Sequence, residues 1–468
     1  MSESPGLLNM QVTNPASGEL LVEIAEDTPA SIAEKLVQAR EAQRAWARTP
    51  LEERMGCIRR FRARVEERTP ELARTLTTEM GKPITQSLNE LRAVLDRLDF
   101  FLERVPAELE AEVVLRSKDG GLEERIAHEP LGVIANVSAW NYPYFVGTNV
   151  FIPALLSGNA VMYKPSELST LSGLEIARAL RESGVPADAF SPIIGGGEVG
   201  SELVRQPVDA VFFTGSYATG QKIAAAVAPR LIKLQLELGG KDPVYVADDV
   251  DIDVAVTSLA DGAFYNTGQS CCAVERIYVH SAIWQRFMDG FVSAVRSFRV
   301  GDPMDESTYI GPLARQKAQI LHLSAQVDDA RAAGASVLLG GERLNRPGYF
   351  FAPTVLTEVT HSMRVMTEET FGPVIGIMKV DSDEEALRLM NDTEYGLTAA
   401  VYSTDRGRAE AILRELSVGT AYWNCCDRVS PRLPWSGRRH SGIGCTLSTY
   451  GIEAFLAPKA WHLKRPRS

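Results

Sequence analysis

Gly132-Val133-Ile134-Ala135-Asn136-Val137 is a short apolar run that is typical of a buried strand. Two more runs of this kind follow, Ala160-Val161-Met162-Tyr163-Lys164 and Ala210-Val211-Phe212-Phe213, and each leads into a helical pattern. Short strands that alternate with helices build βαβ units and a parallel sheet. We therefore predict an α/β fold.

The rest of the chain extends this pattern on both sides. Thr28 followed by Pro29 is a typical start for a helix that reaches about residue 48, and further helices are expected at 51–80 and 84–103. A second α/β block is expected after Gly239-Gly240, with helices at 254–265 and 284–298 and strands at 276–279, 336–339, 354–356 and 374–380. Residues 459–463 read as a lone strand, which we expect to pair elsewhere, for example on another subunit.

Composition restricts the class of protein. The chain has 468 residues, 45% hydrophobic and 23% charged, an ordinary globular balance that suits two or three domains of roughly 100–200 residues. The net charge of −11 and the lack of a basic patch argue against a nucleic-acid or membrane partner. No run approaches the length of a membrane-spanning helix, and residues 1–11 lack a signal-peptide pattern.

The cysteines and histidines indicate a reducing compartment and no metal site. Six cysteines are too few for a disulfide scaffold in a chain of this length, and Cys271–Cys272 and Cys425–Cys426 are adjacent pairs. We therefore expect free thiols and a cytoplasmic protein. The six histidines are scattered without metal-ligand spacing.

A cysteine-containing loop is the first candidate for chemistry. Gly268-Gln269-Ser270-Cys271-Cys272 follows a helical pattern and precedes a strand. A thiol in such a loop, close to backbone amides, can have a lowered pKa and act as a nucleophile. Two small, buried, inert thiols are the alternative, and the cysteines alone leave both interpretations open.

The second candidate is an acid between leucines, in Leu236-Glu237-Leu238-Gly239-Gly240. If this run is a strand, Glu237 lies on the face opposite the leucines, and partial burial beside a cavity would raise its pKa and make it a usable general base. A carboxylate in water on an edge strand is the equally weighted alternative.

Three turns that follow strands offer weaker signals. Thr214 to Gly220 enters a helix and could receive a phosphate, although its Gly-x4-Gly spacing departs from the dinucleotide fingerprint. Lys164 and Glu167 could hold ribose hydroxyls or form a surface ion pair. Asn141, in Trp140-Asn141-Tyr142-Pro143, could donate to an oxyanion or form an Asx turn.

These fragments occur together and in order, and the set resembles the NAD(P)-dependent aldehyde dehydrogenase superfamily from about residue 12 to 465. The glutamate and cysteine motifs are specific to that family. The segments that carry the resemblance are 130–143, Lys164-Pro165-Ser166-Glu167, Phe213-Thr214-Gly215-Ser216, Leu236-Glu237-Leu238-Gly239-Gly240-Lys241, Asn266-Thr267-Gly268-Gln269-Ser270-Cys271, Glu368-Glu369-Thr370-Phe371-Gly372-Pro373 and Ser441-Gly442-Ile443-Gly444.

The resemblance implies catalytic roles. Cys271 would attack the aldehyde carbonyl, and the Asn141 side chain and the Cys271 backbone N–H would hold the oxyanion. Hydride transfer to nicotinamide would leave a thioester, and Glu237 would activate the water that hydrolyses it.

The resemblance also implies a cofactor site for NAD, with NADP as the alternative. Lys164 and Glu167 would grip the adenine ribose, where Glu167 would repel a 2′-phosphate. Gly215 and Ser216 would approach the pyrophosphate. Glu369 and Phe371 would position the nicotinamide riboside, and Trp140 would line the same crevice.

The implied substrate pocket contains several polar side chains. We expect a short polar or carboxylate-bearing aldehyde, with Arg428 as an anion partner or, on the alternative interpretation, as a solvated loop charge. The family's usual Pro-Phe-Gly-Gly is replaced here by Pro434-Trp435-Ser436-Gly437, near the expected substrate entrance and subunit contact. The expected lining residues are Tyr142, Val146, Asn149, Tyr265, Arg428 and Val429.

The architecture implied by the resemblance has three parts. We expect a Rossmann-like cofactor domain (1–111 and 130–238), an α/β catalytic domain (239–445), and a small β extension (112–129 and 446–468) that pairs across a subunit contact in a homodimer or homotetramer.

The residues leave three alternatives to an aldehyde dehydrogenase that hydrolyses its thioester. A CoA-acylating aldehyde dehydrogenase would pass the thioester to CoA, although Glu237 favours hydrolysis. A non-redox thiol hydrolase would use Cys271 but has no convincing histidine partner, because His280 lies at a predicted strand end. A regulatory protein that has lost activity would not need Cys271, Glu237 and Asn141 together.

The two adjacent thiols raise one further hypothesis, a reversible Cys271–Cys272 disulfide under oxidation. It rests on their adjacency alone.

Overall fold

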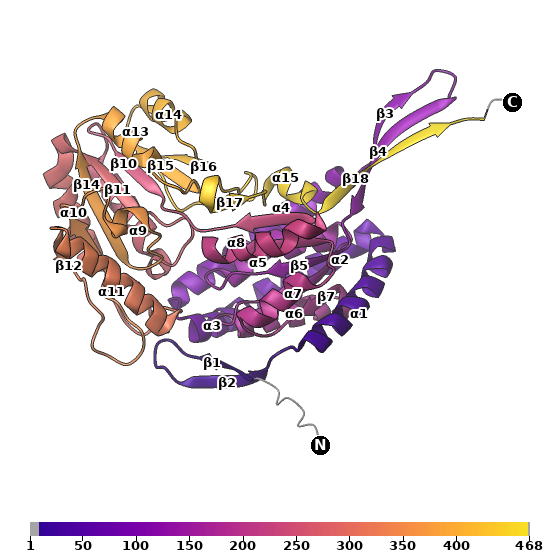
Figure 1. Ribbon diagram of the computed structural model, residues 1–468, viewed down its shortest axis with the longest axis horizontal. Helices are drawn as coiled ribbons and strands as arrows, with labels where there is room; N and C mark the ends of the chain where they lie inside the picture. Colours follow the sequence, from indigo (N-terminus) through magenta and orange to yellow (C-terminus); the bar gives the residue numbers. More distant parts are fainter. Residues whose placement is uncertain (1–8, 467–468) are drawn as a thin grey trace.

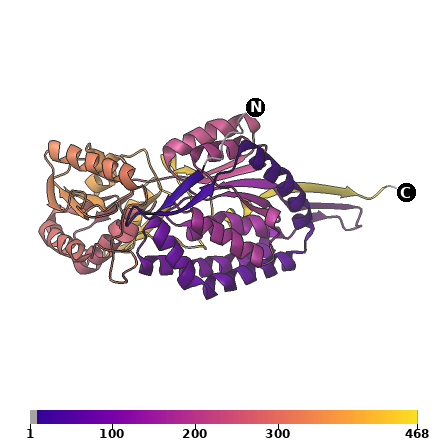
Figure 2. The ribbon, with the colours of Figure 1, turned by 90° about the horizontal axis from the view of Figure 1, so that it is seen from below.

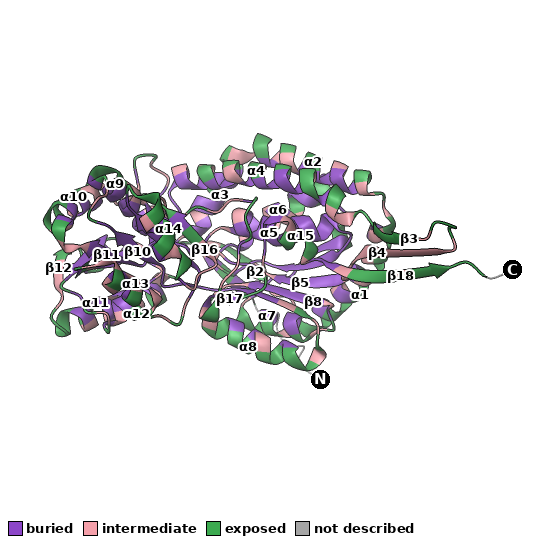
Figure 3. Ribbon diagram, turned by 90° about the horizontal axis from the view of Figure 1, so that it is seen from above, coloured by how far each residue is buried: buried purple, intermediate pink, exposed green. Residues whose placement is uncertain are grey.

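The computed structural model describes residues 9–466 and contains two α/β bodies and a projecting arm (Figure 1). The predicted α/β class is confirmed: each body is built around its own mainly parallel sheet, and the central strands of both sheets are buried (Figure 3). Strands of such sheets are apolar on both faces because helices cover both sides. In residues 9–466, no helix is long and apolar enough to cross a membrane.

The first sheet contains the strands predicted from the opening runs. Its order is β17-β9-β8-β5-β6-β7, and β5 to β9 run parallel. The edge strand β17 (Gly442–Ile443) belongs to the segment 239–445 that was predicted as the catalytic domain, and it pairs antiparallel with β9. The other strands are β5 (Val133–Val137), β6 (Ala160–Lys164), β7 (Phe190–Pro192), β8 (Ala210–Thr214) and β9 (Lys233–Glu237), and the helices that follow β5 to β8 are α5 (Pro143–Leu156), α6 (Thr170–Glu182), α7 (Gly197–Arg205) and α8 (Tyr217–Val227).

The second sheet has seven strands in the order β12-β13-β14-β11-β10-β15-β16. Only β12, at one edge, runs antiparallel to its neighbour. The strands are β10 (Pro243–Val246), β11 (Arg276–His280), β12 (Ser336–Leu339), β13 (Thr354–Thr357), β14 (Val374–Val380), β15 (Thr398–Tyr402) and β16 (Thr420–Trp423). The helices of this body are α9 (Ile252–Phe264), α10 (Trp284–Ser297), α11 (Gln316–Ala332), α12 (Arg364–Thr367), α13 (Asp383–Asn391) and α14 (Arg406–Arg414).

The N-terminal helices differ from the prediction in two places. The expected helix 51–80 is divided at Arg68, where the backbone leaves helical geometry ahead of Pro70, into α2 (Leu51–Glu67) and α3 (Thr69–Met80). A hairpin of β1 (Asn9–Thr13) and β2 (Leu20–Ala25) precedes the helices and was not predicted. The predicted Thr28 cap is confirmed at the start of α1 (Pro29–Arg48), and the third helix, α4, spans Ile84–Leu109.

The arm is a three-stranded antiparallel sheet that extends away from the bodies (Figures 1 and 2). Its strands are β3 (Glu112–Arg116), β4 (Leu122–Pro130) and β18 (Leu456–Lys464), and β4 lies in the centre. As expected, the C-terminal strand pairs with a segment far away in the sequence, but that segment is β4 of the same chain, which β18 contacts along its whole length. A short helix, α15 (Ser448–Glu453), precedes it.

Candidate active site

The cysteine loop lies directly after α9, where the chain makes a left-handed turn. Asn266, Thr267 and Gly268 all have positive φ, and a Cβ on Gly268 would collide with the carbonyl of Gly372. This turn fixes the path of the loop. It leaves Cys271 half-buried and Cys272 fully buried.

The two adjacent thiols have different surroundings. The Cys272 thiol donates to Asp427 Oδ1 at 3.0 Å, and Ser270 Oγ donates to the same oxygen at 3.1 Å. The hydrogen bond with Cys271 and then burial raise the pKa of Cys272 well above its usual value. Burial raises the pKa of Asp427 to about 6. Cys272 is therefore held as a thiol, and Cys271 is the more accessible of the two.

Asn141 joins the first body to the cysteine loop. It lies between β5 and α5, and its Nδ2 donates to the carbonyl of Gln269 at 3.1 Å. Its own carbonyl accepts from Asn266 Nδ2 at 3.3 Å. The side chain is buried, so the predicted oxyanion donor lies beside the loop that carries the predicted nucleophile.

Glu237 ends β9 and is buried. Its carboxylate accepts from the Thr446 hydroxyl and from Gln235 Nε2, the latter at 3.3 Å. Burial raises the pKa of Glu237 to about 7. The structure therefore favours the buried acid over the carboxylate in water, because β17 covers the edge on which Glu237 would otherwise lie.

The predicted adenosine contacts lie at the carboxyl ends of the parallel strands. Lys164 ends β6, is buried, and donates to the carbonyl of Pro165 at 3.1 Å. The Glu167 carboxylate lies 3.8 Å from its ammonium and is half-exposed. Gly215 and Ser216 follow β8, and the exposed Ser216 hydroxyl caps α8 by accepting from the Thr219 N–H at 3.4 Å. A crevice at strand ends is where α/β sheets bind ligands.

The predicted nicotinamide contacts come together from both bodies. The rings of Trp140 and Phe371 meet edge to face with centroids 5.4 Å apart. The Glu369 carboxylate accepts from the Gly240 N–H at 3.2 Å, and burial, with the charge of Glu275, raises its pKa to about 8. Gly239 leaves room for this carboxylate, because a Cβ at 239 would meet the end of the Glu369 side chain.

The predicted pocket residues are only partly brought together. Tyr142, Val146 and Asn149 lie on successive turns at the start of α5. The Tyr265 hydroxyl accepts from Asn89 Nδ2 at 3.3 Å, and Val429 packs against the core cluster that also contacts Cys271. Arg428 has a side chain 67% exposed and lies 4.0 Å from Asp261, which agrees with the alternative interpretation of a solvated loop charge.

Charged residues of the α3–α4 region also contact two of the predicted pocket residues, and the sequence patterns did not single these charged residues out. Lys82 and Glu90 form a fully buried ion pair, with the ammonium 3.6 Å from the centre of the Tyr142 ring. Arg97 is fully buried and donates to Asn149 Oδ1. The available signal was the position of Glu90 and Arg97 next to the apolar stripe of α4, which contains Leu91 and Leu98.

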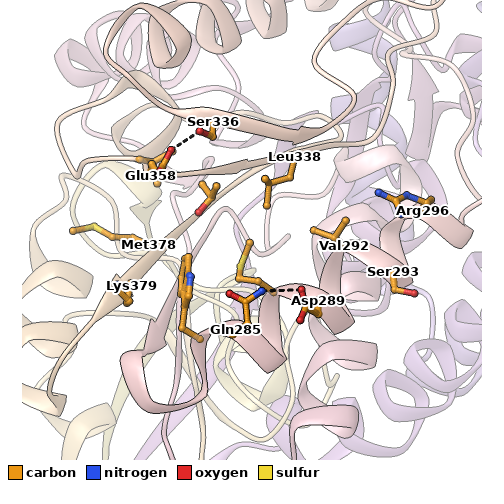
Figure 4. A pocket seen from close by; sticks show the side chains of 14 residues that line it. Gln285, Asp289, Val292, Ser293, Arg296, Ser336, Leu338, Glu358, Met378 and Lys379 are labelled. Carbon is orange, nitrogen blue, oxygen red and sulfur yellow. Dashed lines mark hydrogen bonds between the residues drawn. The ribbon is translucent and has the colours of Figure 1, made fainter.

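A cavity of about 810 Å³ lies elsewhere, between α10 and the strands β12 to β14 (Figure 4). Its lining includes Gln285, Asp289, Arg296 and Glu358, and none of the predicted site residues contributes to it. In residues 9–466, no group of three or more His, Cys, Asp or Glu side chains is placed to hold a metal ion.

The geometry thus places a half-buried thiol, an amide donor and a buried carboxylate at the junction of two α/β bodies. A family model described as "Aldehyde dehydrogenase family" matches residues 2–461. The chain belongs to the aldehyde dehydrogenase family. This confirms the resemblance drawn from the motifs.

Several aldehyde dehydrogenases are similar to this chain over almost its whole length. The chain is 35% identical to "Aminoaldehyde dehydrogenase 1, peroxisomal" from Malus domestica, over 96% of this chain and 91% of that protein. It is 31% identical to the crystal structure of an NADP-dependent enzyme from E. coli, with a TM-score of 0.94 over 98% of this chain and 95% of that one. An NAD-dependent aldehyde dehydrogenase from Sinorhizobium meliloti gives the same identity and TM-score, with 98% and 93% covered.

Proposed function

We propose that this protein oxidises an aldehyde to the carboxylic acid with NAD(P)+ as the oxidant, through a thioester on Cys271 that a Glu237-activated water hydrolyses. The hydrogen bond from Asn141 Nδ2 to the Gln269 carbonyl carries the proposal, because it puts an amide donor next to the cysteine loop. The second N–H of the same amide is free to serve an oxyanion.

The chain's own residues divide the work as follows. Cys271, as thiolate, bonds to the aldehyde carbon, and the charge that develops on oxygen is held by Asn141 Nδ2 and the Cys271 backbone N–H. Loss of hydride from that carbon leaves the thioester. Glu237 then takes a proton from a water molecule, the hydroxide adds to the thioester, and the thiolate leaves with release of the acid.

The residues present fit a dinucleotide. An exposed helix N-terminus with Ser216 as its cap attracts phosphate, and Glu369 and Glu167 offer acceptors for ribose hydroxyls. When bound, NAD(P)+ supplies the acceptor for the hydride. We expect NAD to be preferred, because the half-exposed Glu167 carboxylate would repel a 2′-phosphate.

The substrate class in this proposal is a short polar or carboxylate-bearing aldehyde. Tyr142, Asn149 and Tyr265 support it, because their polar groups would be poor neighbours for a long alkyl chain. The name of the apple relative suggests aminoaldehydes as the competing class. A cytoplasmic location and a homodimer or homotetramer remain part of the proposal.

The experiment incubates the enzyme with a panel of aldehydes and NAD+, with and without CoA. The absorbance of the reduced nicotinamide measures the reaction. Reduction without CoA supports the proposal, reduction only with CoA supports the acylating alternative, and ester cleavage without reduction supports the thiol hydrolase. Cys271→Ser should abolish reduction, and Asn141→Ala should lower it by about 10²–10³-fold. Cys272→Ser is the matched control and should keep most activity. A Cys271→Ser enzyme as active as the wild type would contradict the mechanism.

A further inference from the structure

Among the described residues, Arg97 is a buried cation that combines two features: it has no carboxylate partner, and two of its three guanidinium nitrogens have no hydrogen-bond partner. Its side chain is fully buried in α4, and within residues 9–466 no carboxylate lies at ion-pair distance from it. Lys82 is paired with Glu90, and Lys241 with Glu275. Arg276 is also fully buried without a carboxylate, but each of its three guanidinium nitrogens donates to a backbone carbonyl. A buried donor without an acceptor is costly, so the unsatisfied nitrogens of Arg97 call for a further acceptor.

The contacts of Arg97 leave half of its guanidinium unused. Nη1 donates to the carbonyl of Phe145 at 3.1 Å and to Asn149 Oδ1, and the guanidinium carbon lies 3.2 Å from the centre of the Phe145 ring. Nε and Nη2 are buried and have no hydrogen-bond partner. These contacts fix the orientation of the side chain and leave two nitrogens, with three N–H groups, available.

Arg97 lies within electrostatic reach of the proposed catalytic groups. Its anchors Phe145 and Asn149 belong to α5, the helix that Asn141 precedes, and Phe145 and Cys271 pack against one core cluster. Burial lowers the pKa of Arg97 to about 9, and the nearby charge of Glu237 acts most strongly in the opposite direction. The group therefore stays cationic at neutral pH.

The acids nearby are engaged with other groups. Glu90 is paired with Lys82 and accepts from the N–H groups of Tyr144 and Phe145. Asp427 accepts from Ser270 and Cys272. Glu237 accepts from Thr446 and Gln235. None of these carboxylates accepts a hydrogen bond from Arg97 Nε or Nη2.

We propose that Arg97 determines substrate specificity by selecting an aldehyde that carries an anionic group, such as a carboxylate, a short chain away from its carbonyl. This inference rests on the proposed function. The inference assigns the role of anion partner to the buried Arg97 instead of the exposed Arg428. In the interior, the charge of Arg97 acts on an anionic substrate over several ångströms with little screening. An aldehyde with an ammonium group in the same place would be repelled.

The test uses three four-carbon aldehydes that differ in charge: succinate semialdehyde, butanal and 4-aminobutanal. Wild-type kcat/KM should be highest for succinate semialdehyde and lowest for 4-aminobutanal. Arg97→Met should lower kcat/KM for succinate semialdehyde by about 10- to 100-fold and leave butanal within about 3-fold, as for loss of one charge-assisted interaction. Arg97→Lys keeps the charge and should keep the preference for the anion. Arg92→Met, exposed on the same helix, is the matched control.

Three outcomes would overturn the inference. The first is a wild-type preference for butanal or 4-aminobutanal, which needs no variant and remains decisive if Arg97→Met does not fold. The second is an equal loss for all three aldehydes in Arg97→Met, which would make Arg97 an electrostatic support for Cys271 and Glu237. The third is an Arg97→Lys enzyme without anion preference. Absence of NAD+ reduction with every aldehyde would instead contradict the proposed function.

Discussion

At the scale of single residues, the acidity of Glu237 depends on its surroundings. The carboxylate ends a strand, is covered by β17 and has few hydrogen-bond donors, so that burial raises its pKa to about 7. Glu79 provides a comparison in the same molecule: burial raises its pKa to about 7 as well, but it accepts from the Leu171 and Ser172 N–H groups at the start of α6. A raised pKa alone therefore does not identify a carboxylate that acts as a catalytic base.

The pH dependence of hydrolysis follows from this pKa. A general base acts when it is deprotonated. If hydrolysis of the thioester limits turnover, the steady-state rate should therefore rise with pH, reach half its maximum near pH 7 and fall away at lower pH. Glu237→Gln should keep a burst of about one reduced nicotinamide per active site and lose steady-state turnover by about 10²–10⁴-fold. Rapid-mixing kinetics measures both phases.

Glu79→Gln is the matched control for that experiment. It removes a buried carboxylate of similar pKa that belongs to the α6 cap, so it should reduce stability and leave the pH profile of turnover unchanged. A shift of the inflection in Glu79→Gln, or loss of the burst in Glu237→Gln, would contradict the assignment of Glu237 as the base.

At the scale of structural elements, the cysteine loop depends on one glycine. Gly268 has φ of +70°, and its α-carbon faces the carbonyl of Gly372, which follows the nicotinamide-side Phe371. The turn thus joins the nucleophile loop to the segment that carries Glu369 and Phe371. A displacement of this contact would move both predicted parts of the site together.

Gly268→Ala should therefore impair both stability and activity. The left-handed backbone alone costs about 1–2 kcal/mol for a residue with a Cβ, and the collision with the Gly372 carbonyl adds to it. Gly334→Ala is the matched control, since Gly334 has φ of +99° but open space around its α-carbon. Denaturant unfolding and aldehyde turnover should show both variants destabilised and only Gly268→Ala inactive. Equal behaviour of the two would contradict the role given to this contact.

At the scale of the whole molecule, the arm leaves apolar side chains in solvent. Val113, Val114 and Leu115 of β3 are 47%, 56% and 46% exposed, although they lie in consecutive positions of one strand. Apolar patches on a projecting sheet mark an interaction surface. Together with the expected pairing across a subunit contact, this favours a second copy of the chain as the occupant.

Light scattering after size exclusion tests this oligomer. The wild-type protein should have the mass of a dimer or tetramer, and Val114→Asp should shift it toward smaller species, because a carboxylate would be buried in the contact. Val37→Asp, at a 66% exposed position on α1, is the matched control and should leave the mass unchanged. A wild-type monomer at micromolar concentration would contradict the prediction.

Local sequence patterns were sufficient to predict the α/β class, most strands of both sheets and the order of the motifs. These features depend on local patterns, such as the apolar runs of β5, β6 and β8, and on residue types that chemistry requires, such as Cys271 and Glu237. The family could be recognised for the same reason. The domain boundaries and the roles of the site residues remain predictions.

The contacts between distant segments could be seen only in the folded chain. The pairing of β18 with β4, the addition of β17 beside Glu237, and the burial of Arg97 against α5 each join residues far apart in sequence. Local periodicity carries no information on such contacts, because a charged position on a helix looks the same whether solvent or another helix covers it. The electrostatics of the site therefore depends on packing that no motif encodes.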